Sequence, residues 1–146
     1  MLSAVRLGVL DWAVEVAVLL DACRQLVEYY GSDEEEDSFR RAVETPLWLV
    51  EAIKKLASDE DVDLNARPTS SAFTCSESRA EILTPLIRLV VEWQPAFIDD
   101  ARQAMVEDDW KQLSVTYGLF VGTVARCLCD PMWSKYPRLA PPGWPG

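Results

Sequence analysis

Thr45-Pro46-Leu47-Trp48-Leu49-Val50-Glu51 opens an apolar run, and a related stretch, Thr84-Pro85-Leu86-Ile87-Arg88-Leu89-Val90-Val91-Glu92, begins 39 residues after it. Thr is a favoured N-cap residue, and Pro is well tolerated in the first helical turn, where its missing N–H has no partner to lose. The apolar residues that follow each Thr-Pro recur at helical spacing. Each copy therefore predicts a helix that begins or bends at its Thr-Pro pair.

The chain before the first copy predicts two helices. From about Ser3 to Tyr30, apolar residues cover roughly half of a helical wheel, as expected of a helix that packs between neighbours. Gly31 is a natural stop, because glycine adopts the left-handed cap conformation at little cost. Ser32 and Glu35 match a capping box, and the acidic run 33–37 complements the positive end of the helix dipole.

The chain after about residue 77 predicts further helices, which are separated at Gln94-Pro95 and end before Asp130-Pro131. Ser78 with Glu81 and Asp109 with Gln112 match two more capping boxes. Gly118 and Gly122 lie one helical turn apart in the last of these helices. Since glycine inside a helix costs about 1 kcal/mol, we expect another helix to approach closely there.

These patterns predict an all-α fold of antiparallel helical hairpins, with five to seven helices in one domain over residues 1–130. The segment at about 58–77 is polar and acidic, and we expect it to be a mobile loop. The segment 131–146 contains five Pro together with Trp133 and Trp144, and it predicts an extended tail.

The two Thr-Pro-Leu phrases and the apolar runs behind them resemble HEAT-type helical repeats, such as those of nuclear transport receptors. This resemblance implies a right-handed stack of helical hairpins, with a concave surface that grips a partner peptide or domain, and participation in a larger complex. A compact helical bundle is the alternative, because a free-standing solenoid usually needs three or more repeats.

The composition narrows the class of partner. The net charge is −10, with a pI near 4.4, which argues against direct binding to nucleic acid or to an anionic membrane. A basic protein or peptide is the expected partner. The four Cys show no regular disulfide framework, and no signal peptide or membrane span is evident. We therefore expect buried thiols and a cytoplasmic or nuclear location.

The sequence offers little for catalysis or metal binding. It has no His and no glycine-rich phosphate loop. Asp59-x-Asp61-x-Asp63 imitates the start of a calcium loop, but Leu64 and Ser70 replace its required Gly and Glu. We expect no metal and no cofactor. Carboxylates at 99–100 and 107–109 leave carboxylate-dependent catalysis as a further alternative.

The tryptophans divide into two groups. Trp12, Trp93 and Trp110 lie on apolar helix faces and are predicted core residues, while Trp48 suits either the core or a groove. Trp133 and Trp144, amid prolines, are predicted to be exposed and available to a partner.

These observations favour a non-enzymatic scaffold or adaptor that binds a basic partner. An acidic inhibitor or immunity-type protein that blocks a basic active site is the second reading. The predicted partner-binding residues are Asp33, Glu34, Glu35, Glu36, Asp37, Asp59, Glu60, Asp61, Asp63, Trp133 and Trp144.

Overall fold

The computed structural model describes residues 3–144, and every regular element in that range is helical, which confirms the all-α prediction. The helices are α1 (Ser3–Tyr30), α2 (Asp33–Ala42), α3 (Glu44–Ala57), α4 (Glu77–Glu92), α5 (Phe97–Ala104), α6 (Glu107–Val124) and α7 (Asp130–Lys135). Short 3-10 turns lie at Leu64–Ala66 and Pro137–Leu139, and a π-helical stretch, Ala125–Cys129, joins α6 to α7.

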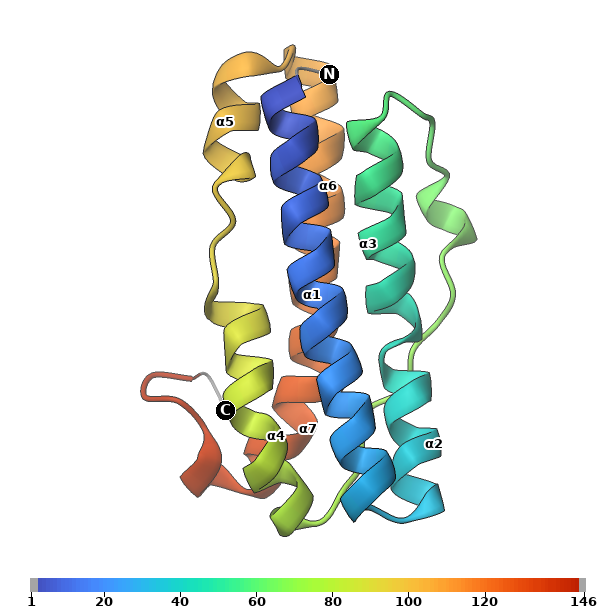
Figure 1. The fold of residues 1–146 in the computed structure, drawn as a ribbon, viewed down its shortest axis with the longest axis vertical. Helices are drawn as coiled ribbons and strands as arrows, with labels where there is room; N and C mark the ends of the chain where they lie inside the picture. The colour runs from blue at the N-terminus through green and yellow to red at the C-terminus, as the bar shows by residue number, and fades with distance from the viewer. Residues whose placement is uncertain (1–2, 145–146) are drawn as a thin grey trace.

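The helices form a compact bundle of two antiparallel hairpins (Figure 1). In the first hairpin, α1 is paired with the bent rod of α2 and α3. In the second, α4 and α5 run up one side and α6 with α7 returns behind α1. The crossover segment 58–76 runs back along α3 and connects the two hairpins.

Trp12 lies where three helices meet and is 1% exposed, as predicted for a core residue. Its ring makes edge contacts with Phe97 of α5 and with Tyr117 and Phe120 of α6, at centroid distances of 5.6, 5.8 and 5.1 Å. Edge-to-face aromatic pairs add about 0.5–1.5 kcal/mol each beyond the area they bury. This cluster fixes the upper half of the bundle. Trp93, in contrast, is 38% exposed, so its predicted core position is wrong.

The two Thr-Pro-Leu phrases stand at different places in their helices. The chain bends at Val43, the N-cap of α3, so Thr45 lies in the first turn of that helix rather than at its cap. Thr84 lies in the middle of α4. Thr45 Oγ1 donates to the Pro68 carbonyl at 2.5 Å, whereas Thr84 Oγ1 accepts from Trp133 Nε1 at 3.1 Å. The phrases thus make different tertiary contacts, and the HEAT resemblance stays a prediction.

The predicted extended tail is wrong for residues 131–135, which form most of α7. Pro131 lacks the N–H that would bond the Cys127 carbonyl, four residues earlier. The backbone N–H of Phe73 donates to that carbonyl instead, at 2.8 Å. The helix therefore continues through Pro131. Beyond it, Tyr136 Oη donates to the Cys75 carbonyl at 2.8 Å, which ties the following segment to the crossover.

The crossover segment is anchored in its second half. Phe73 is 1% exposed and Cys75 is 8% exposed, so this part of the predicted polar loop is packed into the core. The Thr45 N–H also donates to Ser70 Oγ at 2.7 Å. The predicted mobility stays a prediction, and it applies best to residues 59–67, most of which are exposed.

The predicted helix starts are partly confirmed. The Ser32 and Glu35 capping box is present. The N-cap of α4 is Ser76 rather than Ser78, and α6 begins at Glu107 without a side-chain cap, so Asp109 is not a cap residue. Competing Ser residues and consecutive carboxylates at these helix starts offer several cap registers, and tertiary packing selects among them.

The prediction that the first helix stops at Gly31 is confirmed, but the conformation predicted for Gly31 and the close approach predicted at Gly118 and Gly122 are wrong. Gly31 does not adopt a left-handed conformation. Glycine fits here because it has no side chain: a Cβ would lie 2.6 Å from the Val27 carbonyl oxygen. At Gly118 and Gly122 an added Cβ would meet no atom within 4 Å, so no helix approaches them.

The four cysteines are free and buried, as predicted. Burial raises the pKa of the Cys23, Cys75 and Cys129 thiols from 9.0 to about 12. At neutral pH these three side chains behave as small apolar core residues rather than as nucleophiles.

Candidate functional site

The two predicted acidic clusters lie at opposite ends of the bundle. Residues 33–37 form the first turn of α2, and residues 59–63 follow the last turn of α3. Figure 1 shows the start of α2 at the bottom of the molecule and the end of α3 at the top. The structure therefore does not join the two clusters into one surface.

The cluster at α2 is partly engaged within the chain. Glu35 accepts hydrogen bonds from the backbone N–H groups of Ser32, at 3.1 Å, and Ser76, at 2.7 Å. Asp37 forms ion pairs with Arg40 and Arg41. Glu35 thus joins the start of α2 to the start of α4, which is a structural role. The remaining carboxylates of this cluster, Asp33, Glu34 and Glu36, form no ion pair in the described range.

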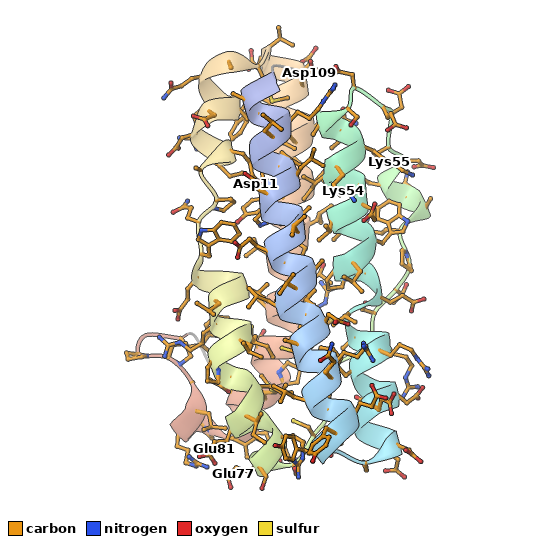
Figure 2. All side chains as sticks on the ribbon, viewed as in Figure 1. Asp11, Lys54, Lys55, Glu77, Glu81 and Asp109 are labelled. Atoms are coloured by element: carbon orange, nitrogen blue, oxygen red, sulfur yellow. The ribbon has the colours of Figure 1, made fainter. Side chains whose placement is uncertain are left out.

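The cluster after α3 lines a surface hollow of about 270 Å³, which we call the acidic hollow. The lining residues are Leu56, Asp59, Glu60, Asp61, Met105, Asp109 and Gln112. Leu56 and Met105 supply the apolar part of this lining, and carboxylates come from both the crossover and α6. Figure 2 labels Asp109 at this end of the bundle.

The backbone at Asp59 sets the direction of the acidic segment. Asp59 has φ 58°, which makes it the one described non-glycine residue with a left-handed backbone conformation. Its N–H donates to the Leu56 carbonyl at 3.2 Å, and the Glu60 N–H donates to the Lys55 carbonyl at 2.9 Å. These two bonds form a Schellman motif, whose left-handed position usually holds glycine.

Arg6 secures this end of α3. Its Nε donates to the Ala57 carbonyl at 3.1 Å, and its Nη2 lies 4.0 Å from Asp59 Oδ2. A cation at the last carbonyls of a helix also complements the negative end of the helix dipole. The long α1 therefore helps to hold the acidic turn in place.

Three carboxylates of the acidic hollow are left without a cation. Glu60, Asp61 and Asp109 are exposed and form no ion pair within residues 3–144. Carboxylates without a paired cation leave the surface that they line negatively charged, and a nearby cation is attracted to that surface. The hollow is therefore arranged to attract positive charge.

A second hollow, of about 370 Å³, adjoins the first and shares Asp61 with it. Trp48 and Val62 line it, so Trp48 occupies a groove, one of the two places predicted for it. Asp63, at its rim, accepts from the Asn65 N–H at 3.0 Å and thereby begins a 3-10 turn. The acidic segment 59–63 thus lies between a charged hollow and an aromatic one.

The two predicted exposed tryptophans lie elsewhere. Trp133 is 1% exposed, so its predicted exposure is wrong; its ring packs against Trp144 at a centroid distance of 4.7 Å. Trp144 is half-buried. The neighbouring prolines indicated an extended, exposed segment, but the helix through Pro131 turns Trp133 into the core.

Sequence reasoning missed the contribution of α6 to the acidic hollow. From the sequence, the carboxylates at 107–109 and Gln112 predict a helix cap or an acid–base pair, and Met105 gives no indication of a site. Pairing of α3 with α6 brings these residues to the crossover, and no local spacing reveals that pairing.

No group of three His, Cys, Asp or Glu side chains suited to holding a metal ion occurs in the part of the chain that the structure describes. Within the same residues, no helix has both the length and the hydropathy needed to cross a membrane. No protein-family model matches the chain, and comparisons with curated proteins and with solved structures also give no match.

Proposed function

We propose that this protein is a non-enzymatic adaptor that binds a basic segment of another protein at the acidic hollow. The observation that carries the proposal is the pairing of uncompensated carboxylates at Glu60, Asp61 and Asp109 with an apolar lining from Leu56 and Met105. This combination matches the side chain of Lys or Arg, which has an apolar stem and a charged head.

The acidic hollow is small. Its volume of about 270 Å³ is near the lower end of the range of about 300–1,000 Å³ that is usual for small-molecule pockets, and one side chain of a partner is the ligand proposed for it. The adjoining hollow presents Trp48, whose ring can pack with an apolar side chain of the same peptide, while Lys55 in its lining already supplies a positive charge there. A short basic peptide that spans both hollows is the proposed ligand.

The overall charge favours encounter with such a ligand. A net charge of −10 raises the rate at which a basic partner arrives, more than it raises the affinity. It also disfavours nucleic acid and anionic membranes as direct partners. The proposed setting is the cytoplasm or nucleus, where basic tails and localisation signals are common ligands for acidic surfaces.

Binding of poly-lysine, measured by isothermal titration calorimetry, tests the proposal. The triple variant Glu60→Gln, Asp61→Asn, Asp109→Asn should lower the affinity about tenfold, since three exposed charge pairs contribute about 0.2–1 kcal/mol each. The wild-type affinity should also fall steeply as salt increases.

The matched control is Asp33→Asn, Glu34→Gln, Glu36→Gln, which removes the same charge at the opposite end of the bundle. We expect this control to lower the affinity by about twofold at most, because distant exposed charges are screened. Equal losses in the two triple variants would show that net charge alone, and not the acidic hollow, attracts the ligand.

A second candidate is an acidic inhibitor or immunity-type protein that occupies a basic active site. The compact bundle favours it, since such a protein does not need an extended concave surface. The separation of the two acidic clusters favours it less, because one dense acidic face would be expected. Under this function, the triple variant at the acidic hollow would abolish inhibition of a basic enzyme.

A further inference from the structure

A second surface, on the outward side of α1, combines apolar side chains with uncompensated negative charge. Leu7, Val14 and Val18 are 62%, 63% and 62% exposed, and their spacing places them on one face of the helix. The inner face of α1 is buried against α2, α3, α4, α5 and α6, yet its outer face also carries apolar side chains. We call this surface the α1 face; α1 lies in front in Figure 2.

An apolar groove runs along each side of the α1 face. One, of about 490 Å³, lies between α1 and the α2–α3 rod, where Leu20, Phe39, Val43 and Leu47 line it. The other lies between α1 and α4, where Leu19, Leu89 and Trp93 line it. An amphipathic helix binds by laying its apolar face along a hydrophobic groove, and the exposed aliphatic side chains of the α1 face border both of these grooves.

The charges around the α1 face indicate which charge a helix bound there would need. Asp11 and Glu15 on α1, and Glu44 at the groove beside it, form no ion pair within the described residues. The cations of that groove are already paired. Arg24 lies 3.0 Å from Asp21 and 2.9 Å from Glu28, and Arg40 pairs with Asp37. The uncompensated charge on this surface is therefore negative.

We propose that the α1 face docks an amphipathic helix of a partner protein, with Leu or a similar side chain over Val14 and Val18 and with Lys or Arg along its flanks. The aliphatic contacts supply affinity, and the flanking cations meet Asp11, Glu15 and Glu44. This surface is distinct from the acidic hollow, so neither proposal depends on the other.

A second copy of the chain suits the α1 face less well. Each copy has a net charge of −10 and uncompensated carboxylates on its α1 face, so two such faces would repel each other. The two occupants also differ in their response to salt. Salt screens repulsion between copies and strengthens self-association, but it weakens the attraction of a basic helix.

A designed amphipathic peptide of Leu and Lys, with a Leu and Glu counterpart, tests this proposal by fluorescence anisotropy. The wild-type protein should bind the Lys peptide, and the Glu peptide at least about tenfold more weakly. Val14→Gln with Val18→Gln should weaken binding of the Lys peptide about 30-fold through lost apolar contact. Gln has a higher intrinsic helix propensity than Val, so this variant should keep its fold.

Two control variants separate the α1 face from other surfaces. Val115→Gln changes a 54% exposed valine on α6, and it should alter binding by about twofold at most. The triple variant of the acidic hollow should keep most of its affinity for the Lys peptide. Equal losses in Val115→Gln and in the α1 variant would overturn the proposal.

Sedimentation velocity at low and high salt completes the test. We expect a monomer at both salt concentrations. A dimer that tightens with salt, and that Val14→Gln with Val18→Gln dissociates, would show that a second copy covers the α1 face and would equally overturn the proposal.

Discussion

Asp59 illustrates how a single residue links backbone geometry to the proposed function. Its left-handed conformation, with φ 58°, is one that an L-residue adopts at a cost of roughly 1–2 kcal/mol. Asp and Asn tolerate it better than other non-glycine residues, but glycine fits best. A carboxylate at the rim of the acidic hollow is therefore present at the expense of stability, as is common at functional positions.

Two substitutions of Asp59 should separate these effects. Asp59→Gly should raise the free energy of unfolding by about 0.5–1 kcal/mol, because it relieves the left-handed strain. Asp59→Ala removes the same carboxylate but keeps the strain and loses local hydrogen bonding, so it should lower stability by about 1 kcal/mol. Both variants should bind poly-lysine with equally reduced affinity. Urea unfolding and calorimetric titration measure the two quantities.

If Asp59→Gly were less stable than the wild type, the contact of Asp59 with Arg6 would outweigh the strain. That result would contradict the small contribution expected of an ion pair at 4.0 Å between half-exposed side chains.

At the scale of the element, α6 contains two glycines at which an added Cβ would contact no neighbouring atom within 4 Å. Gly118 and Gly122 are exposed in the interior of a helix of 18 residues. Gly118→Ala should therefore raise the free energy of unfolding by about 1 kcal/mol, since alanine restricts the unfolded chain and has no atom to displace. Thermal unfolding followed by circular dichroism measures the gain.

The matched control for α6 is Gly8→Ala on α1. A Cβ at Gly8 would lie 3.0 Å from Phe97 Cβ, which is tighter than an ordinary contact, so Phe97 would have to shift by a few tenths of an ångström. We expect this variant to be less stable than the wild type. A loss of stability in Gly118→Ala would instead indicate that another chain contacts this face of α6 in solution.

The elements differ in how well the sequence predicts them. The bounds of α1 follow from its long apolar pattern and from Gly31, and the capping box fixes the start of α2. The helix through Pro131 is not predictable, because it depends on a hydrogen bond from Phe73, more than 50 residues away along the chain. The sequence shows that Pro131 lacks a hydrogen-bond donor, but only the tertiary structure shows that the Phe73 N–H donates to the Cys127 carbonyl in its place.

At the scale of the whole molecule, half of the acidic hollow is predictable. The carboxylates at 59–63 are evident from the sequence, whereas the contributions of Met105 and Asp109 require the pairing of α3 with α6. The α1 face was missed for a related reason. An apolar pattern on a helix predicts burial, and it does not reveal which apolar residues remain after the neighbouring helices are placed.

Because its thiols are buried, the whole bundle should become less stable at alkaline pH. Burial raises the pKa of Cys23 from 9.0 to about 12, so the folded state keeps this thiol protonated where the unfolded chain would release the proton. Stability from this group is complete below pH 9 and is lost as the pH rises from about 9 towards 12. Cys75 and Cys129 act in the same direction.

We therefore expect the free energy of unfolding, measured with urea under reducing conditions, to fall progressively between about pH 9 and 11. Cys23→Ala should lower stability at pH 7 through the cavity it leaves, and it should also make the alkaline decline shallower, because one titrating group is gone. Val16→Ala, on the same buried side of α1, should lower stability at pH 7 and leave the slope unchanged. Parallel declines in all three proteins would mean that Cys23 is not shielded from water in the folded state.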